Sequence, residues 1–174
     1  MNKFGMLRCV EQGFRNELII QMFFRQAPAG VNVVYHGLRF KQINFLTKGK
    51  IGIQTKDGLC FFELHEGIVF GDYQHIFGLK SNFVFKALGE NEEKTKKEDI
   101  KSYPVNYMAV AIDIWDDLCQ LYPKSASACK DIAILKRDVI LHYMNCNLEL
   151  TKNRETGIPA QIADGSEAET PTSV

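Results

Sequence analysis

The sequence predicts a mainly β domain with flanking helices, built as an antiparallel barrel or sandwich. Short runs rich in β-branched and aromatic residues follow one another, with strand starts about eight to twelve residues apart. Glycine-containing turns separate most of these runs. Long stretches with helical spacing of apolar residues lie before the first run and after the last. This order favours antiparallel strands over a sheet in which strands and helices alternate.

The length and the charge of the chain narrow the classes of function. Its 174 residues suit one ordinary domain with short flanking pieces. Basic and acidic residues balance at 21 each, so no overall charge favours nucleic acid or an acidic membrane surface. The most apolar window, residues 18–24, is too short for a membrane span and contains Gln21. The first residues lack the apolar region of a secretion signal, so we expect a cytoplasmic domain without a nucleic-acid partner.

The cysteines and histidines do not form the pattern of a metal site or a disulfide framework. The five cysteines are odd in number, and no two of them have CxxC spacing. We expect reduced, mostly buried thiols, with a reactive cysteine as the alternative. The four histidines are dispersed, and the motifs of nucleotide, metalloprotease and serine-hydrolase sites are absent. The sequence therefore predicts neither an enzyme nor a metal site.

An amphipathic helix is predicted over residues 7–26. Apolar residues recur there on one helical face: Leu7, Val10, Phe14, Leu18 and Met22. We expect this face to pack on the core, with docking of part of it on another chain as the alternative. Pro28 and Gly30 end the helix, because the residue before a proline disfavours helical geometry and glycine permits a turn.

The β part is predicted as a series of short strands. They cover residues 31–35, 42–47, 51–55, 59–64, 68–70, 83–85 and 107–112. Asp57-Gly58 predicts a hairpin between two of them, because a primed turn requires positive φ. Residues 89–101 are mostly charged and are interpreted as a solvated loop between strands.

Residues 67–87 predict a cradle for an anion or a phosphate group. A short apolar run ends at Gly71, Asp72 follows it, and residues with helical and turn character lead to the next strand. The glycine lets the backbone turn tightly, and the free N–H groups of a helical turn attract an anion. His75 lies in this helical turn and is interpreted as a wall residue rather than as an acid or a base.

Two helices are predicted near the C-terminal end. The first begins at Asp113, a suitable N-cap, and Pro123 breaks it. Ser125 or Ser127 is expected to cap the second. Its apolar residues recur at helical spacing: Ala128, Ile132, Leu135, Val139 and Tyr143. The residues beyond Thr151 are poor in apolar side chains, which predicts disorder.

This order of elements resembles the cyclic nucleotide-binding domain family. Phe70-Gly71-Asp72 is similar to the Phe-Gly-Glu opening of that family's phosphate-binding cassette, and residues 70–87 match the cassette's length without a gap. Tyr122-Pro123 resembles the stretch before the family's lid helix. The family's turn glycines match Gly30, Gly37, Gly49, Gly67 and Gly71. The resemblance implies an antiparallel β-roll (a double-stranded β-helix, jelly-roll-like) with N-terminal and C-terminal helices.

Within that family, the chain looks most like the cyclic nucleotide-binding homology domain of ether-à-go-go-type voltage-gated potassium channels. The stretches that carry this likeness are residues 27–30, 34–36, 80–82 and 86–88. The likeness implies three parts. These are an N-terminal linker-type helix at residues 1–27, a cyclic nucleotide-binding-like domain at 28–145 and a disordered tail at 146–174.

The resemblance also implies how a nucleotide would be held. In the family, a Glu of the cassette accepts the ribose 2′-OH and a later Arg pairs with the cyclic phosphate. Here the acid is the shorter Asp72, and Ser81 stands at the Arg position. Losing a charge-assisted phosphate contact weakens binding by about 2–5 kcal/mol. Lys80 is the neighbouring cation, but adjacent residues point apart and a point charge does not copy a bidentate fork.

Phe83 stands where the family usually has a small residue. We expect its ring to fill the space of a nucleotide, with base stacking as the alternative. In ether-à-go-go-type channels a segment after the last helix fills the pocket as an intrinsic ligand. The matching residues 134–136 lack that segment's aromatic-Asn-Leu pattern, which leaves self-liganding open. The residues of this predicted degenerate pocket are Phe70, Gly71, Asp72, Lys80, Ser81, Asn82 and Phe83.

The predicted function is that of a non-catalytic regulatory domain, the cytoplasmic gating or assembly module of a potassium or cation channel. Its expected partners are other domains or subunits of a channel, or a second copy of the chain. No resident cofactor is expected, and weak binding of cAMP or cGMP stays open. A working cAMP or cGMP sensor is the alternative, and a stand-alone scaffold is another. Thr172-Ser173-Val174 fits the carboxyl ends that PDZ-type domains bind by strand addition.

Overall fold

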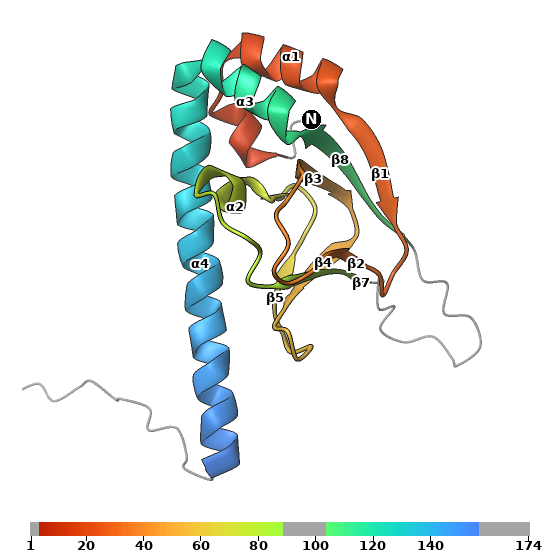
Figure 1. Cartoon of the computed structure of the whole chain (residues 1–174), viewed down its shortest axis with the longest axis vertical. Coiled ribbons are helices and arrows are strands. Elements are labelled where there is room, and N and C mark those ends of the chain that lie inside the picture. Colours follow the sequence, from red (N-terminus) through yellow and green to blue (C-terminus); the bar gives the residue numbers. More distant parts are fainter. Residues whose placement is uncertain (1–3, 89–103, 157–174) are drawn as a thin grey trace, which may run out of the picture.

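The computed structural model describes residues 4–88 and 104–156, with side chains up to residue 148. Eight strands form the centre of the described part, and helices lie at one end and along one side (Figure 1). The helices are η1 (Gly5–Arg8, a 3-10 helix), α1 (Gln12–Gln21), α2 (Asp72–Ile76), α3 (Ile112–Leu121) and α4 (Pro123–Thr156). The predicted fold class, mainly β with flanking helices, is confirmed.

The strands pair into two antiparallel sheets of four. The first sheet has the order β1 (Phe23–Ala27), β8 (Val105–Ala111), β3 (Gln42–Lys48) and β6 (Val69–Phe70). The second has the order β2 (Asn32–Val34), β7 (Val84–Leu88), β4 (Lys50–Gln54) and β5 (Cys60–Leu64). Strands that are neighbours in a sheet are mostly distant in sequence, as in a jelly-roll-like β-roll. The expected hairpin joins β4 to β5, and the N–H of Gly58 donates to the carbonyl of Thr55 at 3.1 Å.

The interior of the roll is one apolar cluster. Ile51 and Ile53 of β4 are fully buried there, and Gly52 between them lies on the other face of the strand, as the period of two requires. Phe85 of β7 and Leu46 of β3 complete the centre of this cluster. Ala133 and Ile140 of α4 belong to the same cluster, so α4 covers one side of the roll.

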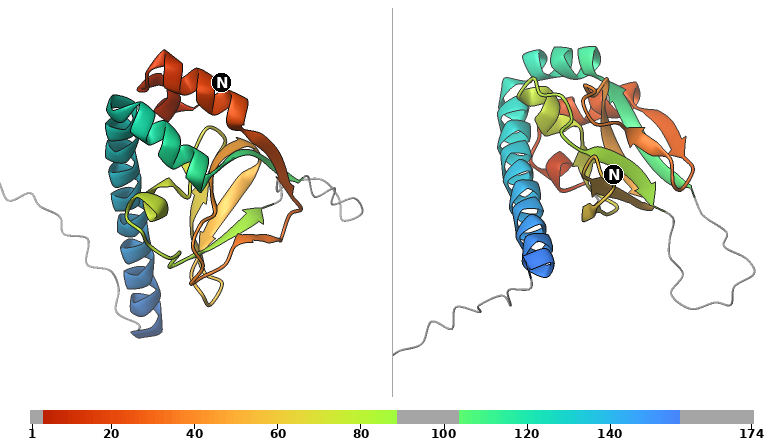
Figure 2. Two further views of the ribbon diagram at one scale, coloured as in Figure 1. Left: turned by 45° about the horizontal axis from the view of Figure 1, so that its top comes forward. Right: turned by 60° about the horizontal axis from the view of Figure 1, so that its bottom comes forward.

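A second apolar cluster lies between the outer face of the first sheet and the helices. Ile43 and Phe45 of β3 point into it, whereas Leu46 points into the roll, so β3 is buried on both faces. The ring of Phe14 in α1 meets Trp115 in α3 edge to face, with centroids 5.7 Å apart. Figure 2 shows α1 and α3 together at one end of the sheet. The N-terminal helix therefore packs on the core, as predicted.

The N-terminal helix is shorter than the apolar spacing predicts. It ends at Gln21, and residues 23–27 form strand β1, which pairs with β8 from Phe23↔Ala109 to Ala27↔Val105. The prediction of a helix to residue 26 is wrong because strand pairing satisfies the backbone groups of this stretch. Such tertiary pairing overrides local helix preference.

The two C-terminal helices have different ends from those predicted. Helix α3 follows Ala111 as its N-cap, while Asp113 lies in the first turn and accepts the N–H of Ile114 at 2.9 Å. Helix α4 begins at Pro123, a residue that suits the first helical position. Ser125 is buried and binds Glu11 at the start of α1 instead of acting as a cap.

Helix α4 continues to Thr156, so its last turns occupy part of the stretch predicted as tail. The charged loop at residues 89–101 and the carboxyl-terminal Thr172-Ser173-Val174 lie outside the described residues. Within residues 4–88 and 104–156, no helix combines the length and the hydrophobicity that spanning a bilayer requires.

Candidate functional site

The predicted cradle is built from β6, Gly71 and α2. Gly71 has a φ of +93°, and a Cβ added there would lie 2.6 Å from Cδ1 of Phe40. Both the backbone conformation and the space therefore require glycine. The short helix α2 starts directly after it and lies beside α4 in both views of Figure 2. The structure thus places Phe70, Gly71 and Asp72 at a turn that faces the long C-terminal helix.

Asp72 is paired with a lysine from α4. Its side chain is 1% exposed, and Oδ2 accepts a hydrogen bond from Nζ of Lys136. The same Nζ donates to the carbonyl of Val69 at 2.6 Å. The second carboxylate oxygen, Oδ1, has no hydrogen-bond partner within the described part of the chain. The acid that the resemblance assigns to a ribose hydroxyl is therefore held by the protein's own ammonium group.

Ser81 lies fully buried at the position of the family's Arg. Its N–H donates to the carbonyl of Leu38, and its own carbonyl accepts the N–H of Gly37, both at 2.7 Å. Its hydroxyl donates to the carbonyl of Phe83 at 2.7 Å. Lys80 and Asn82 on either side are exposed. Ser81 thus stabilises a turn between two chain segments, and Lys80 points away from the interior.

Aromatic rings fill the interior next to the cradle. Phe83 is 5% exposed, and its ring centroid lies 5.0 Å from that of Phe61 in β5. Phe70 stacks on Phe85 with centroids 5.8 Å apart. Burial, and to a lesser degree the charge of Asp72, raises the pKa of the Tyr73 hydroxyl, so this group stays neutral at physiological pH. The inner wall of the cradle is packed as core.

Helix α4 contacts the cradle and β5 at further points along its length. The guanidinium of Arg137 lies over the ring of Phe77, 4.8 Å from its centroid. Farther along, Tyr143 meets Phe62 with ring centroids 5.1 Å apart. These contacts hold the helix in place as a cover over the roll.

A second link joins the cradle to α3. Nε2 of His75 in α2 lies 2.6 Å from Oδ1 of Asp116. The imidazole is about a quarter exposed, and it connects the outer side of α2 to the helical layer. The interpretation of His75 as a wall residue rather than an acid or a base stays a prediction.

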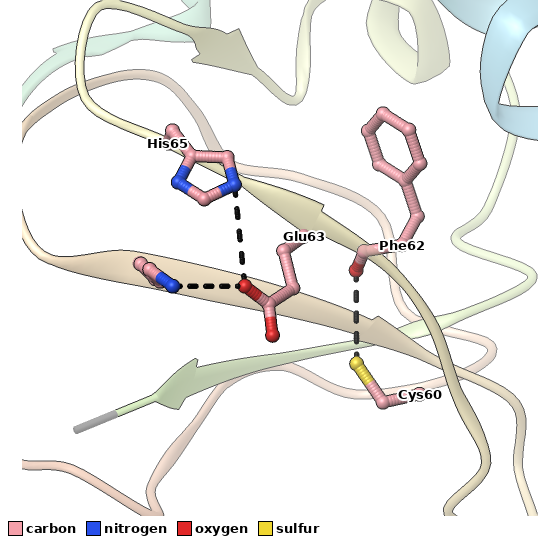
Figure 3. A network of polar contacts seen from close by, with 5 residues as sticks. Cys60, Phe62, Glu63 and His65 are labelled. Atoms are coloured by element: carbon pink, nitrogen blue, oxygen red, sulfur yellow. Dashed lines mark hydrogen bonds and ion pairs between the residues drawn. The ribbon is translucent and has the colours of Figure 1, made fainter. Parts of the chain in front are cut away.

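A network of polar contacts lies on the surface around β5. Glu63 lies 3.2 Å from Nζ of Lys50 and 4.0 Å from Nε2 of His65, and the Cys60 thiol donates to the carbonyl of Phe62 (Figure 3). Partial burial is the main cause that raises the pKa of Cys60, so its thiolate is disfavoured.

The five cysteines are all free thiols. Burial raises the pKa of Cys119 to about 11 and that of Cys129 to about 12. Cys9 and Cys60 are exposed, so the expectation of mostly buried thiols holds only for part of the set. Among the described residues, no group of three or more His, Cys, Asp or Glu side chains is arranged to hold a metal ion.

Sequence reasoning missed the role of Lys136, although the sequence contains a signal for it. Cys129, Ala133 and Ile140 form the buried stripe of α4, and Lys136 falls on the same stripe. A lysine at a buried position is nearly always paired, so its place on this stripe predicts an acidic side chain opposite it. The comparison of residues 134–136 with the aromatic-Asn-Leu motif did not predict the pairing of Lys136 with Asp72.

Solved structures with similar folds were found, while no family model and no curated protein matches the sequence. The C-linker/CNBHD of zELK channels, crystallised in the presence of cAMP, aligns with a TM-score of 0.58 and 15% identity over 74% of this chain and 59% of that one. The cAMP-bound PfPKA-R aligns with a TM-score of 0.61 and 14% identity over 86% of this chain and 44% of that one. The chain spans about three fifths of the first structure and less than half of the second.

Proposed function

From the cyclic nucleotide-binding fold that this chain adopts, we propose that it is a non-catalytic regulatory domain whose pocket is degenerate and closed by its own residues. The observation that carries this proposal is the pairing of Lys136 with Asp72. The ammonium group of α4 takes the carboxylate that would otherwise accept a ribose hydroxyl.

Three features oppose a nucleotide in this pocket. A bound nucleotide would have to separate Lys136 from Asp72 and displace the ring of Phe83 from the core. Its phosphate would also lack a guanidinium partner, because Ser81 stands at that position. Breaking a buried ion pair by itself is strongly unfavourable. A net penalty of about 3 kcal/mol weakens binding roughly 150-fold.

The role that we propose for this domain is the cytoplasmic gating or assembly module of a potassium or cation channel, with other channel domains or subunits, or a second copy, as partners. The likeness to the C-linker/CNBHD of zELK channels supports it. So does the link between Ser125 at the start of α4 and Glu11 at the start of α1, where the Ser125 hydroxyl and the Glu11 carboxylate are 3.0 Å apart. A displacement of α4 would therefore move α1, which lies within the predicted linker-type segment at residues 1–27.

Calorimetric titration with cAMP and cGMP tests the closed pocket. We expect no binding stronger than the millimolar range to the unmodified chain. The variant Ser81→Arg combined with Phe83→Ala and Lys136→Met restores the phosphate partner and the space, and we expect it to bind at least tenfold more tightly. Micromolar binding by the unmodified chain would contradict the proposal.

A working cyclic nucleotide sensor is the second candidate, favoured by the unpartnered Oδ1 of Asp72 and by the likeness to the cAMP-bound PfPKA-R. In that case Lys136 is a latch that the ligand displaces. The sensor predicts that cAMP raises the unfolding temperature of the unmodified chain and that Asp72→Ala abolishes this rise. An unchanged unfolding temperature at millimolar cAMP removes this candidate.

A further inference from the structure

Two surface segments that are distant in sequence form one patch. Residues 35–41 join β2 to β3, and residues 77–83 join α2 to β7. The N–H of Ser81 donates to the carbonyl of Leu38, and the N–H of Gly37 donates to the carbonyl of Ser81, both at 2.7 Å. These hydrogen bonds hold the two segments side by side. We call the exposed side chains that they carry the basic patch: Tyr35, Leu38, Arg39, Lys41, Leu79 and Lys80.

The charged side chains of the basic patch are all cations. They are Arg39, Lys41 and Lys80, and neither segment contains an aspartate or a glutamate. Asp116, which reaches the border of the patch, bonds His75 and leaves the three cations without an ion pair among the described residues. Because basic and acidic residues balance over the whole chain, this excess of positive charge is local. It favours an anionic partner at this place.

Large apolar side chains are exposed between these cations. Leu38 is 55% exposed, Tyr35 54% and Leu79 44%. Hollows of about 260 and 190 Å³ adjoin them, and Arg39 and Phe40 line both. Drug-sized ligands occupy pockets of about 300–1,000 Å³, so each hollow suits a single side chain better than a whole small molecule. Exposed apolar groups that are rimmed by polar ones mark interaction surfaces.

This mixture of charge and apolar surface favours a peptide over other polyanions. Lys and Arg side chains that hold nucleic acid often neutralise about 6–10 phosphates, and clusters that recognise anionic membranes contain about 4–8 such residues. The basic patch has three, and phosphate groups would leave Leu38 and Leu79 without an apolar contact. A second copy that used the same patch would bring cations against cations.

We propose that the basic patch is a docking surface for an acidic peptide segment of another protein, in which large apolar side chains lie between Asp or Glu residues. The planar guanidinium of Arg39 pairs with a carboxylate of the segment, and Lys41 and Lys80 attract its other acids. Apolar side chains of the segment enter the hollows on either side of Arg39. This inference goes beyond the proposed function and does not depend on it, because Asp72 and Lys136 are not part of the patch.

Selection from a display library of random peptides on the full chain tests the chemistry of the partner. We expect the recovered peptides to be enriched in Asp and Glu beside Leu, Phe or Trp. The tightest of them, synthesised with a fluorescent label, should bind in the range of about 1–100 μM by anisotropy, and added salt should weaken this binding. Recovered peptides without enrichment in acidic residues would overturn the inference.

Charge reversal tests whether the labelled peptide binds the basic patch. Arg39→Glu combined with Lys80→Glu should weaken its binding at least about tenfold. Lys124→Glu combined with Lys130→Glu makes the same change in net charge at exposed positions of α4, and it should change the affinity by less than about twofold. Equal losses in the two variants, or no loss in the first, would overturn the inference.

The apolar part of the contact has its own test. Leu38→Ser should weaken binding of the labelled peptide about fivefold, because it removes apolar surface from the contact. Leu121→Ser, at a position in α3 that is 67% exposed, is the matched control and should leave the affinity unchanged. Single-stranded DNA and phosphatidylserine vesicles serve as the other polyanions. The inference is also overturned if Leu38→Ser binds as the unmodified chain does, or if DNA or the vesicles displace the peptide from the patch.

Discussion

The buried polar groups on the two sides of α2 differ in whether the protein provides them with a partner. On the side that faces α4, Asp72 is paired with Lys136, and the neighbouring interior is filled by aromatic side chains. On the opposite side, Gln74 is as deeply buried as Asp72, yet both of its amide atoms lack a partner in the described residues and a hollow adjoins it. Burial alone therefore does not show whether the protein itself satisfies a polar group.

Replacing Lys136 should have the largest effect, because it leaves the Asp72 carboxylate buried without its counter-charge. We expect Lys136→Met to lower the free energy of unfolding by about 3–5 kcal/mol. Urea unfolding followed by fluorescence of Trp115, the single tryptophan of the chain, measures this loss.

The control variants define what Lys136 contributes. Lys130→Met removes an exposed charge from the same helix and should change stability by no more than about 0.5 kcal/mol. Combining Lys136→Met with Asp72→Asn removes both charges and should recover much of the loss. If Lys136→Met lowers the free energy of unfolding by less than about 1 kcal/mol, the ion pair between Lys136 and Asp72 does not hold α4 against the cradle.

Gly71 should be the next most sensitive position, since it shapes the turn into α2. Gly71→Ala combines a left-handed backbone with a contact of 2.6 Å to Phe40, and we expect a loss of about 2–4 kcal/mol. Gly30 is the matched control, because its φ is +84° but no described atom lies within 4 Å of an added Cβ. Gly30→Ala should lose only about 1–2 kcal/mol by thermal unfolding. Equal losses at the two glycines would show that the close approach to Phe40 is unimportant.

Gln74 and Asn44 offer the direct test of satisfied against unsatisfied burial. Each residue is 1% exposed, but the side chain of Asn44 bonds the carbonyl of Gln42 at 3.2 Å and also the carbonyl of Phe70. Asn44→Leu should lower the free energy of unfolding by about 1–3 kcal/mol, because it strands these partners. Gln74→Leu should be neutral or stabilise the chain by up to about 1 kcal/mol. Chemical unfolding of both variants measures the difference, and a larger loss at Gln74 would show that its amide is satisfied by the protein.

The link between His75 and Asp116 should have the smallest effect, since both side chains are partly exposed. We expect His75→Ala to lower the free energy of unfolding by about 0.5–1 kcal/mol. A double-mutant cycle with Asp116→Asn measures the coupling between the two groups. A coupling above about 2 kcal/mol would show that the outer side of α2 is held as firmly as the inner side.

Much of the β part could be predicted from local patterns. The predicted runs around residues 42–47, 51–55 and 59–64 coincide with β3, β4 and β5 to within a few residues. Gly49 and Gly71 were matched to turns, and both have positive φ. These predictions succeed because strand periodicity and the demand for glycine at positive φ act over a few residues.

The helical parts show the limit of such patterns. Leu18 and Met22 continue an apolar spacing that predicts a helix to residue 26, yet residues 23–27 pair with β8, some eighty residues away. Ser125 has the chemistry of an N-cap, yet its hydroxyl binds Glu11 in a different helix. In both cases a contact between distant segments outweighs the local preference.

The sequence by itself determined the mainly β fold, the turn at Gly71 and the absence of a guanidinium at Ser81, because each depends on residue type or on short-range spacing. Only the tertiary structure decided that Lys136 neutralises Asp72 and that Gln74 is left without a partner among the described residues. Lys136 and Asp72 are 64 residues apart in sequence. Whether a buried polar group finds a partner depends on which segments pack together, and no local pattern carries that information.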